Sequence, residues 1–221
     1  MKRLFCLILL SALLLGVFTS CTKNRKYDEG EVKAAALELI KKSEMLNEVF
    51  WGAGIEYIDD RNTANGNYYE ASYSSLQKFG FSTIKELEDI TRATFSDEYS
   101  NLILSTTISS IVDDDGLQIL ARYYQKYEDA EGKEPLCIMV YSLTDPLLKD
   151  EVVYDYDSLK VINSKKETVY VNIDCTVTRE DGKTQKKTLE IGLIEEANGW
   201  RLDTPTYATY NQEYYDKNKD N

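Results

Sequence analysis

The apolar residues of this 221-residue chain change their spacing part-way along, from a helical period to an alternating one. Between residues 31 and 51 they recur at helical spacing, as at Leu37 and Ile40, which predicts a long amphipathic helix ended by Gly52 and Gly54. Between residues 169 and 177 apolar and polar residues alternate, as in a strand with one buried face. Helices followed by antiparallel strands predict an α+β fold, with N-terminal helices packed on a twisted, curved antiparallel sheet.

Capping signals predict two shorter helices after the first one. Thr83 and Glu86 have the spacing of a capping box before an apolar stripe, and Ser96 precedes a predicted helix over residues 97–105. The segment 55–75 lies between the first two predicted helices and is rich in tyrosine and asparagine. We therefore expect it to be a loop.

Strands are predicted for most of the second half of the chain. They cover residues 117–127, 136–142, 151–163 and 169–177, a return strand through Leu189 and Leu193, and a last strand through Trp200 and Leu202. The pairs Asp181-Gly182 and Asn198-Gly199 mark hairpin turns. We expect one domain over residues 31–207, with Trp51 and Trp200 in its core, and a polar tail over residues 208–221.

The N-terminus has the pattern of a signal peptide. Lys2 and Arg3 precede an apolar run over residues 4–17, and Thr19 and Ser20 lead to Cys21. The pattern resembles a bacterial lipobox, in which signal peptidase II cuts before a cysteine that carries the lipid. The resemblance implies a signal peptide over residues 1–20, a diacylated Cys21, a polar tether over residues 21–30, and anchoring to the outer face of the cell membrane. The alternative is an ordinary signal peptide or an uncleaved anchor, with Cys21 incidental.

The charge of the chain argues against a nucleic-acid partner. Lys2 and Arg3 leave with the predicted signal, so 24 basic residues remain against 38 acidic ones, a formal net charge of about −14. An acidic surface repels phosphate backbones and gives no polybasic attraction to an anionic membrane. A lipid on Cys21 would supply the membrane attachment instead.

The chain contains no histidine. This excludes Ser-His-Asp and Cys-His catalytic arrangements and histidine metal ligands, and it leaves carboxylate chemistry or a Ser-Lys pair. The acidic segments 113–115 and 60–66 lack the ligand spacing of a calcium loop and are predicted to be turns or loops. We therefore expect no metal, no cofactor and no catalytic residue.

Two cysteines, Cys137 and Cys175, lie in predicted strands outside the signal peptide. We expect two buried free thiols that act as small apolar residues. The alternative is a disulfide bond, which requires the two strands to be neighbours.

Seventeen tyrosines form several clusters along the chain. Tyrosine offers a large amphipathic contact area, which is typical of recognition surfaces, but it is also a common strand residue. The expected ligand- or partner-binding residues are Tyr68, Tyr69, Tyr73, Tyr154 and Tyr156.

The last predicted strand, with Asn198-Gly199-Trp200-Arg201-Leu202-Asp203-Thr204-Pro205, is similar to the final strand of nuclear transport factor 2-like (cystatin-like) domains. The segments Leu46–Gly54 and Thr83–Tyr99 resemble lipoproteins grouped with the bacterial DL-endopeptidase inhibitor family. The lipobox pattern, the acidic charge, the absence of histidine and the tyrosine clusters together predict a non-enzymatic, lipid-anchored binding protein that recognises a protein or cell-envelope component. A specific form of this function is inhibition of a cell-wall hydrolase, in which the acidic protein occupies a substrate groove. The alternatives are a small-ligand carrier with a pocket between sheet and helices, and a carboxylate-based enzyme.

Replacing Cys21 with serine tests the anchor. The Cys21→Ser variant should lose incorporation of radiolabelled palmitate and should move from the membrane fraction to the soluble fraction, because serine offers no thiol for acylation. Fractionation with immunoblotting measures the second effect. Unchanged lipid labelling and unchanged membrane retention would contradict the lipoprotein interpretation.

Overall fold

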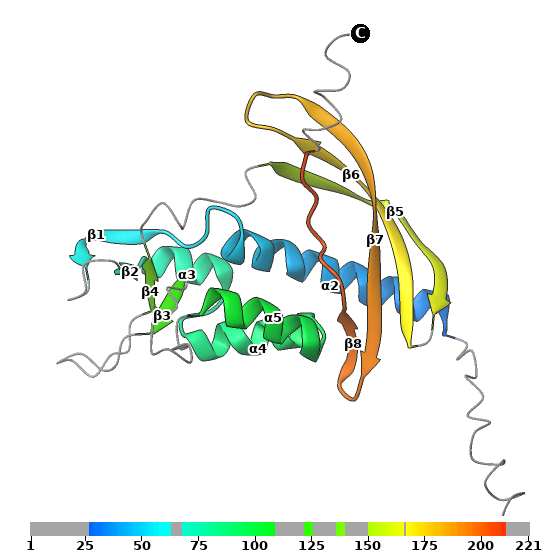
Figure 1. The fold of residues 1–221 in the computed structure, drawn as a ribbon, viewed down its shortest axis with the longest axis horizontal. Helices are drawn as coiled ribbons and strands as arrows, with labels where there is room; N and C mark the ends of the chain where they lie inside the picture. The colour runs from blue at the N-terminus through cyan, green and yellow to red at the C-terminus, as the bar shows by residue number, and fades with distance from the viewer. Residues whose placement is uncertain are drawn as a thin grey trace, which may run out of the picture.

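The computed structural model describes residues 27–62, 68–108, 122–125, 136–139, 150–165 and 167–210. Its elements are α2 (Glu29–Phe50), β1 (Tyr57–Asn62), β2 (Tyr68–Ala71), α3 (Tyr73–Phe79), α4 (Ile84–Thr94), α5 (Asp97–Thr107), β3 (Tyr123–Gln125), β4 (Leu136–Met139), β5 (Glu151–Lys165), β6 (Thr168–Thr178), β7 (Thr184–Glu196) and β8 (Gly199–Leu202). The fold is α+β, as predicted, but the described strands form two four-stranded antiparallel sheets with the orders β1-β2-β4-β3 and β5-β6-β7-β8 (Figure 1). Among the described helices, none is both long enough and apolar enough to cross a membrane.

Helix α2 runs through the middle of the molecule (Figure 1). Asp28 caps its N-terminus by accepting a hydrogen bond from the backbone N–H of Glu31 at 2.8 Å, so the helix begins inside the segment expected to be a polar tether. Just before this cap, Tyr27 meets Trp200 edge-to-face with ring centroids 5.2 Å apart. The chain therefore packs on the domain from Tyr27 onward, and Trp200 is buried, as predicted.

The predicted meander of antiparallel strands is confirmed in β5–β8. The alternation in β6 buries Val171 and Ile173 and leaves Asp174 exposed. Val171 lies opposite Ile191 of β7, so the buried residues of neighbouring strands share one face. We call this the inner face, because it packs on α2, and we call the opposite face, which carries Asp174, the outer face. Both predicted hairpin turns are present, with Gly182 and Gly199 at positive φ.

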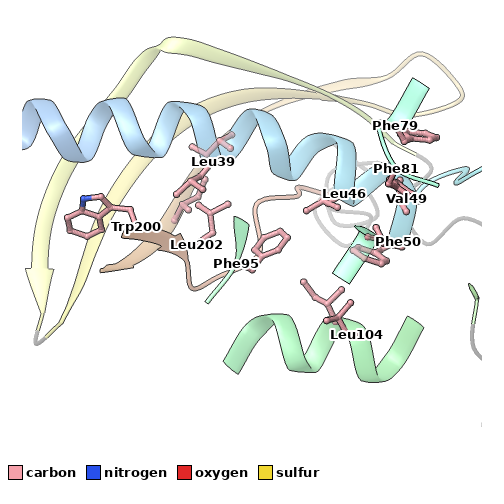
Figure 2. Close-up of a cluster of buried hydrophobic side chains, with 14 of the residues drawn as sticks. Leu39, Leu46, Val49, Phe50, Phe79, Phe81, Phe95, Leu104, Trp200 and Leu202 are labelled. Atoms are coloured by element: carbon pink, nitrogen blue, oxygen red, sulfur yellow. The ribbon is translucent and has the colours of Figure 1, made fainter. Parts of the chain in front are cut away.

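A single large cluster of buried side chains joins α2 to both the inner face and the shorter helices. Figure 2 shows Leu39 close to Leu202 and Trp200 at one end, and Leu46, Val49 and Phe50 towards the other. Each fully buried aliphatic side chain of this kind contributes about 1.5–3 kcal/mol. The cluster makes α2 the common partner of elements that are far apart in the sequence.

The two predicted helix caps are both confirmed. Thr83 Oγ1 accepts from the backbone N–H of Glu86 at 3.1 Å, and the Glu86 carboxylate accepts from the backbone N–H of Thr83 at 3.2 Å. Ser96 accepts from the backbone N–H of Tyr99 at 3.2 Å and donates its hydroxyl proton to Asp203 at 2.6 Å. The cap of α5 is therefore tied to the chain that follows β8.

The prediction of a loop over residues 55–75 is wrong. This segment contains β1, β2 and the start of α3, and Tyr69 of β2 pairs with Ile138 of β4. The partner strand lies far along the chain, so the local abundance of tyrosine and asparagine did not reveal the pairing. The strands predicted over 117–127 and 136–142 are present as β3 and β4, and their remaining parts (117–121, 126–127 and 140–142) lie outside the described residues.

Arg122 and Tyr123 hold the C-terminal end of α2. Tyr123 is the first residue of β3, and Arg122 directly precedes it. Arg122 donates to the carbonyls of Phe50 at 2.9 Å and Gly52 at 2.7 Å, and the Tyr123 hydroxyl donates to the carbonyl of Val49 at 2.5 Å. The last turn of α2 has no basic residue of its own, so the Arg122 charge complements the helix dipole. Gly54 has a φ of 81°, which strains any larger residue, and a Cβ there would lie 2.3 Å from an Arg122 guanidinium nitrogen and displace it.

The chain after β8 continues across the inner face beyond α2. Residues 204–210, which we call the strap, follow β8 along the sheet (Figure 1). Ala208 and Tyr210 of the strap are buried against Cys175 and Val177 of β6. The packed chain thus extends past the domain boundary expected at residue 207. Cys175 and Cys137 are both buried, lie in different sheets and form no disulfide bond, which confirms the prediction that the two thiols do not pair.

Truncation of one inner-face residue tests the assignment of the two faces. Ile173→Ala should lower the free energy of unfolding by about 2–5 kcal/mol, because it leaves a cavity against α2. The control is Val153→Ala on the outer face, where the side chain is 57% exposed and the loss should stay below about 1 kcal/mol. Urea denaturation measures both changes, and equal losses would contradict the assignment.

Candidate functional site

The inner face of the β5–β8 sheet is packed rather than hollow. Under α2 it is filled by side chains such as Leu159 and Leu193, which are at most 1% exposed. Farther along, the strap covers Cys175 and Val177. The space in which a small-ligand carrier would hold its ligand is therefore occupied by the protein itself, within the described part of the chain.

A cleft of about 240 Å³ opens beside the strap, between the second half of α2 and the start of β5. We call it the acidic cleft. Its polar lining consists of four carboxylates, one amide and two tyrosines: Glu44, Glu48, Asp150, Glu151, Asn47, Tyr154 and Tyr207. None of the described residues that line it is basic, so this part of the cleft favours a positively charged group.

Glu44 is the most perturbed carboxyl group of the acidic cleft. Burial raises its pKa, and the charge of Lys41 acts in the opposite direction. The Oε1 atom of Glu44 is buried without a hydrogen-bond partner in the described structure. Ionised Glu44 is therefore poorly solvated, and a cation that enters the cleft would stabilise it.

The two tyrosines predicted on β5 have structural partners. The Tyr154 hydroxyl donates to the carbonyl of Thr206 in the strap at 2.6 Å, and burial raises the pKa of Tyr154, so it remains a protonated donor. Tyr156 packs beside Tyr154 with ring centroids 6.2 Å apart and lies under the ammonium group of Lys41, 4.9 Å from the ring centroid. Tyr154 borders the acidic cleft, but its main role is to hold the strap.

The three tyrosines predicted on the 68–73 segment separate into buried and exposed positions. Tyr68 is only 4% exposed and clusters with Cys137, so the structure contradicts its place on a recognition surface. Tyr69 is half-buried and lies 5.2 Å from the ring of Tyr57, which is 40% exposed. Tyr73, at the start of α3, is 71% exposed. We call Tyr57, Tyr69 and Tyr73 the aromatic end, because β1, β2 and α3 lie beyond the C-terminal end of α2 (Figure 1).

The outer face carries a second, more open groove of about 400 Å³. Asp155 of β5 lies directly opposite Asp174 of β6, and Thr188 of β7 donates a hydrogen bond to Asp174 at 2.5 Å. Both carboxylates are exposed on this face. Among the described residues, no group of three or more acidic or cysteine side chains is placed to hold a metal ion.

Several sequence-based expectations lie outside the described residues. They are the signal peptide over residues 1–20, the lipidation site Cys21, the acidic turn 113–115 and the tail beyond Tyr210. Comparison with protein-family models, with curated proteins and with solved structures finds no match to this chain. The interpretation of the site therefore depends on its own residues.

Sequence reasoning missed the acidic cleft and the contribution of Tyr57. Glu44 and Asp150 are distant in the sequence, and nothing in their local pattern distinguishes them from the many other acidic residues. Tyr57 belongs to the same tyrosine-rich segment as Tyr68, Tyr69 and Tyr73, but the local sequence does not distinguish its exposed ring from the buried ring of Tyr68.

The pH dependence of stability tests the environment of Glu44. Its pKa is higher in the folded than in the unfolded state, so folding is favoured at low pH and loses this contribution as the pH rises through the folded pKa. Glu44→Gln should therefore stabilise the protein at pH 7 relative to wild type and have little effect near pH 4. Urea denaturation at both pH values measures the difference.

Glu38 on the same helix is the matched control. A hydrogen bond from Lys42 and the Lys42 charge lower the Glu38 pKa, so Glu38→Gln should change stability in the opposite direction at pH 7. If both glutamine variants shift stability in the same direction, the burial of Glu44 is not what perturbs it.

Proposed function

We propose that this protein is a lipid-anchored, extracytoplasmic binding protein without enzymatic activity. It recognises a protein or another cell-envelope component on the outer face of a bacterial membrane, and it is held there by the lipid on Cys21. The anchor rests on the lipobox-like sequence at residues 18–21.

The observation that carries the binding function is the aromatic end. Large aromatic side chains are usually buried, so the exposure of Tyr73 and Tyr57 on neighbouring elements needs an explanation. Tyrosine is enriched where proteins meet partners, because it gives a wide contact area and a hydroxyl donor at little entropic cost. The aromatic end is therefore the part of the described surface best suited to a macromolecular partner.

The direction of α2 orients the aromatic end away from the proposed membrane anchor. The tether enters at Tyr27, beside Trp200, and the aromatic end lies beyond the other end of α2 (Figure 1). A helix of 22 residues is about 33 Å long. With the lipid on Cys21, the aromatic end is thus held away from the bilayer, where an envelope partner can reach it.

We assign the β5–β8 sheet and its helices to the nuclear transport factor 2-like architecture as part of the same proposal. The support is a long helix packed in the inner face of a curved antiparallel meander, with Trp200 and Leu202 of the last strand buried against it. A specific form of the function is inhibition of a cell-wall hydrolase. The acidic cleft beside Glu44 and Asp150 supports it, because it suits a basic side chain of such a partner.

A binding and inhibition assay tests the function. Immobilised mature protein should retain at least one purified cell-wall hydrolase from an envelope extract, and the same protein added in solution should slow peptidoglycan cleavage by that enzyme. Absence of both binding and inhibition across the hydrolases tested would overturn the inhibitory form. Turnover of peptidoglycan fragments by the protein alone would overturn the non-enzymatic assignment.

A pair of surface variants tests the aromatic end. Tyr73→Ala should weaken binding to the retained partner at least tenfold, because exposed aromatic anchors carry most of the energy of such interfaces. The control is Leu102→Ala on α5, where an apolar side chain is 59% exposed on a different part of the surface. Surface plasmon resonance compares them, and equal affinities of the two variants would exclude the aromatic end as the interface.

A further inference from the structure

The strap is attached to the domain differently from the strands around it. Its main chain is held by side chains: the Tyr154 hydroxyl and the Lys187 ammonium donate to the carbonyls of Thr206 and Thr209, and the backbone N–H of Tyr210 donates to Asp150 at 2.7 Å. The strands β5–β7, in contrast, are joined by main-chain ladders, which run without interruption between β6 and β7 and with two irregularities between β5 and β6. Detaching the strap therefore requires no ladder to break.

A buried polar cluster at Thr206 also holds the strap. Its hydroxyl is 2.7 Å from the Ser43 hydroxyl and accepts a hydrogen bond from the Asn47 side-chain amide at 3.0 Å. Thr206 and Ser43 are fully buried. When the strap detaches, water can satisfy all three side chains, so the detached state carries no unpaired buried donor.

The surface beneath the strap is apolar. Val177 and Cys175 are buried by Ala208 and Tyr210, and Val152 packs at the edge of this cluster. Near the strap's end, Arg179 stacks its guanidinium over the Tyr210 ring, 5.1 Å from the centroid. These contacts form a small cluster that shares only the half-buried Tyr154 and Leu189 with the main core, so losing them leaves most of the apolar packing of α2 in place.

We propose that the strap is a lid, which opens as a unit while the rest of the domain stays folded and so controls access to the apolar part of the inner face around Cys175. The opening is a partial unfolding of the C-terminal segment, which detaches at Tyr210 and Thr206 and hinges where Asp203 is bonded to the Gly192 carbonyl. The proposal concerns a different face from the aromatic end and does not depend on the proposed function.

The Cys175 thiol provides a direct measure of opening. The full-length protein is treated with iodoacetamide at increasing urea concentration, and mass spectrometry of peptides separates modification at Cys175 from that at other cysteines. Ile173→Cys supplies a reference thiol in the same strand, at a position buried under α2 rather than under the strap. Cys175 should react at least tenfold faster than the reference thiol in the absence of urea. Its modification rate should depend only weakly on the urea concentration, because opening of the strap exposes little surface.

Two strap variants complete the test. Thr206→Val should accelerate modification of Cys175 at least about fivefold, because it leaves Ser43 and Asn47 without their partner only in the closed state. The control Thr209→Val should leave the rate unchanged, because the exposed Thr209 side chain is replaced while its carbonyl remains. Asp150→Ala, which removes the acceptor at the other end of the strap, replaces Thr206→Val if that variant does not fold.

The outcomes are distinct. The lid is supported if Cys175 is modified faster than the reference thiol, with a weak dependence on urea, and if Thr206→Val or Asp150→Ala accelerates this modification while Thr209→Val does not. Modification of Cys175 and of the reference thiol at the same rate and with the same urea dependence would show that the strap opens only on global unfolding, and would overturn the proposal. So would a rate at Cys175 that is insensitive to both fastening variants.

Discussion

The burial of helix α2 is the constraint on which the rest of the structure depends. Its apolar residues are too widely distributed around the helix for one partner to cover, so the inner face of the β5–β8 sheet packs on one side and α4 and α5 complete the cover (Figure 2). Remote segments contact both ends of the helix. Trp200 packs on Tyr27 and donates to the Glu31 carboxylate at the N-terminal end, and Arg122 donates to the Phe50 carbonyl at the C-terminal end. The part of α2 that each element covers therefore determines where that element lies.

Buried polar groups fix the position of the strap, which apolar packing alone would not determine. Ser43 and Asn47 lie on the buried side of α2 and need hydrogen-bond partners, which Thr206 supplies. This requirement places the strap along α2 and, through it, closes one side of the acidic cleft. The cleft, the strap and the perturbed Glu44 therefore arise from one arrangement, whereas the aromatic end is built independently on β1, β2 and α3.

Sequence patterns predicted the elements whose signals are local. The alternation around Ile173 assigned the inner and outer faces of β6 correctly, and the spacing of Thr83 and Glu86 predicted a capping box that the structure contains. The pairing of β2 with β4 was not predictable in this way, because its partner lies beyond three helices in the chain. For the same reason Tyr68 and Tyr73, which belong to one tyrosine cluster in the sequence, have opposite exposure.

The sequence by itself determined the fold class, the order of the β5–β8 meander and the caps of α4 and α5, because each depends on periodicity or capping within a short segment. Only the tertiary structure decided that the strands form two sheets, that the strap covers Cys175, and that Glu44 shares a cleft with Asp150. The physical reason is that periodicity encodes which face of an element is buried. It does not encode which distant element buries that face, and sites formed between distant elements depend on that choice.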